Sequence, residues 1–140
     1  MAQDITQVVL AEDNESVRRG IRKLLNKAPD IKVIGEARDG IETLRLVNEL
    51  EPDVLLLDVE MPLLNGIEVA RQLNKSGKVI RILVLSAYDD LQYIRQMLVN
   101  GAAGYLIKDE APERILEAVR GVAQGEIGWV SPRVRAKLAR

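Results

Sequence analysis

Short, mostly apolar runs alternate along the chain with segments whose apolar residues recur every three or four positions. The five runs are three to seven residues long and lie at residues 8–11, 31–37, 54–57, 80–85 and 105–107. Runs of this kind, bounded by Gly, Pro, Asn or Asp, are typical of β-strands. Each is followed by the spacing of a helix that buries one apolar face, so the pattern predicts five strand–helix units.

This alternation predicts one α/β domain with a doubly wound, parallel five-stranded sheet that helices cover on both faces. The third run, 54–57, is apolar throughout, as the central strand of such a sheet should be. A chain of 140 residues is long enough for one compact domain and too short for two ordinary ones. Such a domain favours the flavodoxin-like strand order 2-1-3-4-5, with a switch point between the first and third strands.

Ionisable and hydroxyl side chains follow four of the five predicted strands. They are Glu12, Asp13, Asp58, Ser86 and Lys108. Because the carboxyl ends of parallel strands meet at one edge of an open sheet, where ligands bind, we expect these side chains to lie together. The run at 31–37, which would lie at the sheet margin, supplies no evident member of this group.

The composition narrows the chemistry that this edge can perform. The chain has no Cys and no His, which excludes disulfides, thiolate metal sites and the commonest general base. Clustered carboxylates then favour a hard cation, and Mg²⁺ is the one expected in the cytosol. With Lys108 it would neutralise the oxygens of a phosphoryl group while Asp58 attacks in line and Ser86 donates a hydrogen bond. Taken alone, each of these residues has an ordinary role in a turn, a helix cap or a solvated strand end.

Charge and hydropathy exclude two further classes of partner for these residues. The 20 basic residues are balanced by 21 acidic ones, so broad electrostatic binding to nucleic acid is not expected. The N-terminal residues lack the basic and long apolar regions of a signal peptide, and the apolar runs are too short to span a membrane. We therefore expect a cytoplasmic protein without membrane contact.

The chain resembles the receiver domain of two-component response regulators over about residues 6–125. The segments that match, in the order and spacing of the family, lie at 9–14, 56–62, 65–66, 85–87 and 104–108. The resemblance implies the CheY-like fold and phosphorylation of Asp58 by the phosphohistidine of a sensor histidine kinase. It also implies that the chain is no enzyme for external substrates and catalyses only its own phosphorylation and dephosphorylation.

The resemblance assigns further roles to the same edge of the sheet. Asp13 and Asp58 would bind Mg²⁺ directly, Glu60 through its backbone carbonyl and Glu12 through water. Lys108 would bind the phosphoryl group. Ser86 and Tyr105 would form the switch that alters the face of the fourth helix, fifth strand and fifth helix, through which a homodimer is possible.

Two details resemble the NarL/FixJ type of regulator. Asp109 follows Lys108 where many receivers have a proline, and Ser131-Pro132 follows a glycine-containing linker. These regulators carry a helix-turn-helix domain, so we expect transcription control, with DNA contacted only through a domain that this chain lacks. We expect the receiver at 1–125, and a linker with the start of a linker helix at 126–140.

The same residues suggest three other functions. A stand-alone receiver would act by protein–protein contact. A haloacid-dehalogenase-like phosphatase also uses an aspartyl nucleophile, but that nucleophile normally lies on the first strand, and this chain leaves no room for a cap domain. A flavodoxin-like cofactor binder is disfavoured because no Gly-, Ser- or Thr-rich phosphate loop follows the first strand.

Overall fold

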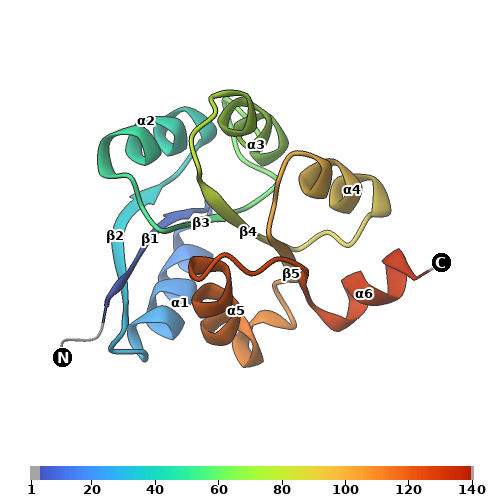
Figure 1. Cartoon of the computed structure of the whole chain (residues 1–140). Coiled ribbons are helices and arrows are strands. Elements are labelled where there is room, and N and C mark those ends of the chain that lie inside the picture. Colours follow the sequence, from blue (N-terminus) through green and yellow to red (C-terminus); the bar gives the residue numbers. More distant parts are fainter. Residues whose placement is uncertain (1–3, 140) are drawn as a thin grey trace.

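The structure, a computed structural model, describes residues 4–139 and contains a parallel sheet between two layers of helices (Figure 1). The strands are β1 (Thr6–Ala11), β2 (Ile31–Ala37), β3 (Val54–Leu57), β4 (Arg81–Ser86), β5 (Gly104–Ile107) and β6 (Trp129–Val130). The helices are α1 (Glu15–Asn26), α2 (Gly40–Leu50), α3 (Gly66–Lys75), α4 (Leu91–Val99), the 3₁₀ helix η1 (Ala111–Glu113), α5 (Ile115–Ala123) and α6 (Pro132–Leu138). No helix within this range is both long and apolar enough to cross a membrane.

The strand order is β2-β1-β3-β4-β5-β6, with all neighbours parallel. This confirms the predicted order 2-1-3-4-5 for the first five strands and the doubly wound α/β fold. The predicted count of five strands is wrong by one, because Trp129 and Val130 pair with Gly104 and Tyr105 as a sixth strand. Two residues are too few to show a strand period in the sequence, so this strand was not predictable from the hydrophobic pattern.

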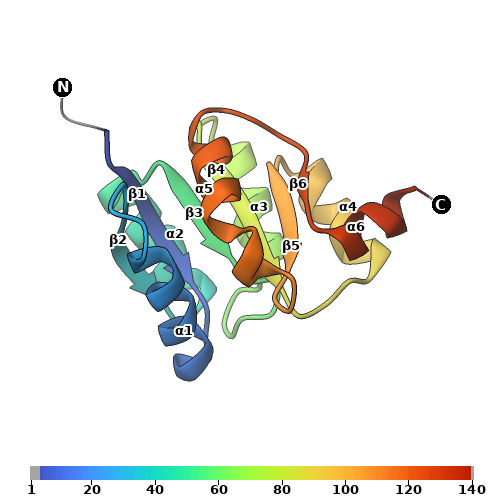
Figure 2. The same ribbon diagram turned by 90° about the horizontal axis from the view of Figure 1, so that it is seen from below.

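The sheet separates two hydrophobic cores (Figures 1 and 2). Helices α2, α3 and α4 cover one face, and α1 and α5 cover the other. Strand β3 contributes side chains to both cores and is fully buried, as its continuous apolar run predicts. This arrangement leaves the carboxyl ends of the strands as an exposed edge between the two helical layers.

The segment predicted as a linker, 126–140, contains β6 and α6, and both contact the domain. Trp129 N donates to Ala103 O (3.2 Å), and Ser131 N donates to Tyr105 O (3.2 Å). Val134 of α6 is fully buried in the core shared with α4. The outer edge of β5 is therefore covered by residues of the same chain (Figure 2).

Candidate functional site

The structure brings together the acidic residues that follow β1 and β3. Glu12, Asp13 and Asp58 each offer a carboxylate oxygen, and these atoms lie within 4.8 Å of one another. Glu12 and Asp58 are buried and Asp13 is exposed, so the cluster reaches solvent at Asp13. The predicted convergence of carboxylates at this edge is present in the fold.

Main-chain pairing explains why these residues meet. Strand β1 aligns with β3 so that Ala11 lies opposite Leu57, and Asp58 N donates to Ala11 O (3.1 Å) just beyond the paired residues. Glu12 N donates to Ala37 O (3.0 Å) at the end of the neighbouring β2. Main-chain hydrogen bonds of the sheet thus fix the positions of Glu12 and Asp58 relative to each other.

Lys108 connects the two buried carboxylates. Its Nζ donates to Asp58 Oδ2 (3.2 Å) and forms an ion pair with Glu12 Oε1. Burial alone lowers the pKa of Lys108, but the hydrogen bond to Glu12 and the charge of Asp58 outweigh it and hold the pKa above its ordinary value. Lys108 N also donates to Ser86 O (2.8 Å), which ties the end of β5 to the end of β4.

Asp58 has one paired and one unpaired oxygen. Its Oδ1 is buried and has no hydrogen-bond donor within the described range. Burial, together with the charge of Glu12, raises the pKa of Asp58 to about 6 against the opposing charge of Lys108. A buried carboxylate oxygen without a donor costs free energy unless a cation compensates it, so this donor set of oxygens alone fits a hard cation such as Mg²⁺.

The chain past Asp58 turns back tightly to start α3. Gly66 N donates to Val59 O (2.8 Å), and a Cβ on Gly66 would lie 2.0 Å from Asp58 O. Only a residue without a side chain allows this approach, which gives the Asn65-Gly66 pair a physical reason. Glu60 lies in this turn, and its carboxylate accepts a hydrogen bond from the hydroxyl of Tyr93 on α4 (3.4 Å).

Ser86 and Tyr105 are both fully buried and both contact the main chain of Tyr88. Tyr88 N donates to Ser86 Oγ (3.0 Å), and the hydroxyl of Tyr105 donates to Tyr88 O (2.7 Å). Burial raises the pKa of Tyr105 to about 12, so its hydroxyl stays protonated and able to donate. Within residues 4–139 the two predicted switch residues thus meet at the loop after β4, and neither hydrogen-bonds to Asp58.

Sequence reasoning missed two charged residues near the site, Arg18 and Glu36. Arg18 lies on the buried face of α1 and contacts both Glu36 of β2 and the main-chain oxygen of Glu12. The available signal was an arginine placed among the apolar positions of a helix, one residue after Val17 and three before Ile21. Strand β2, which offered no evident site residue, is linked to the acidic cluster through this contact.

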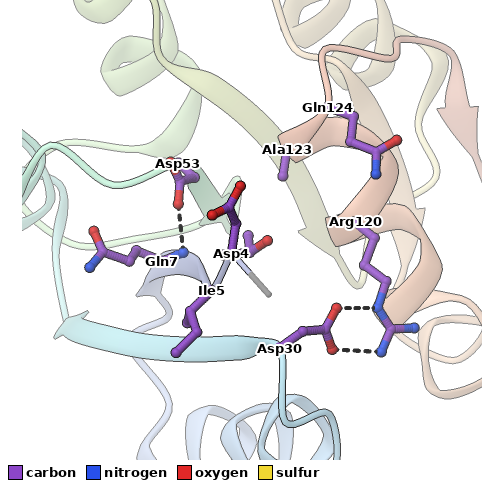
Figure 3. A pocket seen from close by; sticks show the side chains of 9 residues that line it. Asp4, Ile5, Gln7, Asp30, Asp53, Arg120, Ala123 and Gln124 are labelled. Carbon is purple, nitrogen blue, oxygen red and sulfur yellow. Dashed lines mark hydrogen bonds and ion pairs between the residues drawn. The ribbon is translucent and has the colours of Figure 1, made fainter. Parts of the chain in front are cut away.

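Among the other hollows of the described residues, one lies far from the acidic cluster and one lies next to it. A pocket of about 610 Å³ lies at the amino ends of the strands, and three of its four charged side chains, all but Asp4, are paired (Figure 3). Arg120 binds both oxygens of Asp30 (2.8 and 2.9 Å), and Asp53 accepts from Gln7 N (2.7 Å). An apolar groove of about 220 Å³ lies beside Lys108 between α1 and the start of α5.

Comparisons with known proteins agree with this geometry. Residues 8–120 match the family described as the response regulator receiver domain. The chain is 36% identical over 132 residues to the transcriptional regulatory protein DegU of Brevibacillus brevis. This alignment covers 94% of this chain and 56% of DegU. It is 38% identical over 125 residues to the nitrate/nitrite response regulator protein NarL of Escherichia coli, with 89% and 58% covered. The chain thus spans a little over half the length of these relatives.

Solved structures of similar proteins have the same fold. The signal receiver domain of a response regulator from Mycobacterium tuberculosis superposes with a TM-score of 0.84 at 36% identity, covering 88% of this chain and 99% of that one. A LuxR-family two-component response regulator from an Aurantimonas species gives a TM-score of 0.90 at 27% identity, covering 97% and 96%. The second superposition extends over almost all of the described residues.

Proposed function

The chain belongs to the response regulator receiver domain family, of the NarL/LuxR type, and on that premise we propose that Asp58 accepts a phosphoryl group from a sensor histidine kinase in a Mg²⁺-dependent reaction. The observation that carries the proposal is the state of the two Asp58 oxygens. Oδ2 is paired with Lys108, whereas Oδ1 is buried without a donor. A carboxylate held in this way is poised for a cation and an incoming phosphorus atom.

In the proposed transfer, an oxygen of Asp58 attacks the phosphorus of the phosphohistidine in line. The O–P bond forms as the P–N bond breaks, and the leaving imidazole takes the electron pair and then a proton. Lys108, which stays charged beside Asp58, offsets the negative charge of the transferred group. Ser86, at the end of the adjacent strand β4, would hydrogen-bond a phosphoryl oxygen once its hydroxyl turns from Tyr88.

Magnesium would be held by Asp13 and Asp58 directly, by Glu12 through water and by the backbone carbonyl of Glu60. When bound, it supplies positive charge to the equatorial phosphoryl oxygens. The cluster of Glu12, Asp13 and Asp58 and the unpaired Asp58 Oδ1 support this assignment. The cluster keeps a net negative charge, because the single positive charge of Lys108 does not balance the charges of three carboxylates.

Output is proposed to pass through β5 to α6. The phosphoryl group would attract the side chains of Ser86 and Lys108. The loops that follow these two residues contain Asp89 and Asp109. Both carboxylates pair with Arg133 of α6 (3.8 and 3.9 Å). The fourth-helix, fifth-strand and fifth-helix face is thereby joined to the segment after it. Since β6 and α6 occupy the edge of β5, a homodimer through this face would require residues 129–138 to move.

We further propose that the output is control of transcription through a helix-turn-helix domain outside this chain. DegU is named a transcriptional regulatory protein and NarL a nitrate/nitrite response regulator, and both proteins are longer than the chain. The alternative, a stand-alone receiver acting by protein contact, uses the same site. In either case the chain would act only on its own Asp58 and not on external substrates.

The test is intact-mass measurement after incubation with Mg²⁺ and a small phosphodonor such as acetyl phosphate. We expect one added phosphoryl group, lost in Asp58→Asn and in the presence of a chelator. Asp53→Asn, which alters an aspartate at the opposite edge of the sheet, is the matched control and should label like the wild type. Unchanged labelling of Asp58→Asn, or turnover of an external phosphate ester by the wild type, would overturn the proposal.

A further inference from the structure

Arg18 is a charged residue in a buried position. It is 8% exposed and lies on the same face of α1 as Ile21 and Leu25, which pack in the core between α1 and the sheet. Burying a guanidinium costs free energy unless polar partners replace the lost water. Arg18 has two such partners: Nε donates to Glu36 Oε1 (3.2 Å), and Nη1 donates to the main-chain oxygen of Glu12 (2.9 Å).

The bond from Arg18 completes the fixation of Glu12. Glu12 N donates to Ala37 O, its Oε2 accepts from Asn14 N (3.0 Å), and its Oε1 pairs with Lys108. The carbonyl that Arg18 binds belongs to the peptide unit between Glu12 and the next residue. Because a peptide unit is planar, the direction of this carbonyl also sets the direction in which the chain enters Asp13.

Arg18 is itself anchored by β2. Glu36 lies opposite Leu10 in the β1–β2 pairing, and its carboxylate also binds Arg22 Nη1 (2.9 Å). Two arginines thus share one carboxylate, about one turn apart on α1. Only Arg18 also contacts the main chain of Glu12. Arg22 is therefore a matched control for Arg18, because both side chains bind Glu36.

We propose that Arg18 is a positioning residue for the cation site, holding the Glu12–Asp13 peptide so that both carboxylates face the metal, with Glu36 as its anchor. The inference rests on the proposed Mg²⁺ site. Groups that orient metal ligands from behind commonly change metal affinity by about 10- to 100-fold when they are removed. Arg18 makes the kind of contact that such a group requires, because it touches a ligand-bearing peptide and no metal-facing atom.

Electrostatics alone predicts the opposite result. Arg18 and Arg22 are both positive and both lie near a cluster that binds cations, so removing either charge should slightly strengthen Mg²⁺ binding. Positioning predicts that Arg18→Gln weakens Mg²⁺ binding by about tenfold or more, whereas Arg22→Gln does not weaken it. The sign of the change in Arg18→Gln therefore separates the two explanations.

The experiment titrates Mg²⁺ into the full chain by calorimetry for the wild type, Arg18→Gln and Arg22→Gln. Thermal unfolding without metal reports on the fold, and labelling by acetyl phosphate at saturating Mg²⁺ reports on the chemistry. We expect a raised Mg²⁺ Kd in Arg18→Gln, with labelling largely restored at saturating metal. A Kd for Arg18→Gln within about twofold of the wild type, or equal weakening in both variants, would overturn the inference.

Arg18→Lys keeps the positive charge but cannot reach both partners, and it carries the test if Arg18→Gln does not fold. We expect its Mg²⁺ Kd to rise several-fold, with Arg22→Lys unchanged, and wild-type affinity in Arg18→Lys would contradict the inference. A wild type that binds no Mg²⁺ would instead defeat the proposed function. The two failures are thus distinguishable.

Discussion

Ser131 Oγ accepts a hydrogen bond from the main-chain nitrogen of Ile107 (3.1 Å), the residue immediately before Lys108. Ser131 N in turn donates to the main-chain oxygen of Tyr105 (3.2 Å). Ser131, the N-cap residue of α6, is therefore bonded to β5 and its C-terminal end through both its main-chain nitrogen and its hydroxyl. A displacement of this strand would therefore also move the start of α6.

Replacing Ser131 by alanine should destabilise the domain. Ser131 is fully buried, so the variant leaves the main-chain nitrogen of Ile107 without an acceptor, at a cost of about 1–3 kcal/mol. Denaturant unfolding measures the change, and hydrogen exchange should show less protection at 129–138. Ser76→Ala, at the exposed end of α3, is the control and should change the free energy of unfolding by no more than about 0.5 kcal/mol. Equal effects in the two variants would contradict the role given to Ser131.

Stability without metal should fall as the pH rises from about 4 to about 6. The pKa of Asp58 is about 6 in the folded protein against 3.8 for the ordinary group, so the folded state binds the proton more tightly. The destabilisation is complete above about pH 6, and Asp58→Asn should remove it and stabilise the protein by roughly 1–3 kcal/mol at pH 7. Urea unfolding of both proteins between pH 4 and pH 8 measures this, and parallel pH profiles would show that Asp58 is not the group responsible.

Added Mg²⁺ should raise the unfolding temperature of the wild type, because a ligand that binds only the folded state stabilises it. Asp13→Asn should lose most of this shift, since Asp13 offers one of the three clustered carboxylates. Asp39→Asn keeps a side-chain acceptor for the cap of α2, away from the cluster, and should retain the full shift. A normal Mg²⁺ response in Asp13→Asn would remove that residue from the site.

Two glycine-to-alanine changes should have opposite signs. A Cβ on Gly66 would meet Asp58 O at 2.0 Å, so Gly66→Ala should destabilise the domain by about 1–3 kcal/mol and slow labelling of Asp58. A Cβ on Gly20 meets no atom within 4 Å, so Gly20→Ala in α1 should stabilise it by about 0.5–1 kcal/mol. Unfolding free energies and labelling rates of both variants check this, and a neutral Gly66→Ala would refute the close approach.

Much of the site could be predicted because its members follow strands. The positions of Asp58 and Lys108 after two apolar runs depend on a local pattern, and parallel strands bring their carboxyl ends to one edge whatever the details of packing. The unpaired oxygen of Asp58 could not be predicted in the same way. It depends on which carboxylate Lys108 reaches, across 50 residues to Asp58 and 96 to Glu12.

The sequence by itself determined the alternation of strands and helices and the edge at which the polar residues gather, whereas the order of the first five strands was an expectation from the fold class that the structure confirms. These features follow from side-chain periodicity and chain connectivity, which are local. Only the tertiary structure decided that β6 and α6 cover β5, and that Arg18 reaches from α1 to Glu36 and Glu12. Both depend on contacts between segments far apart in the chain, whose partners are selected by packing and by the need to satisfy buried polar groups.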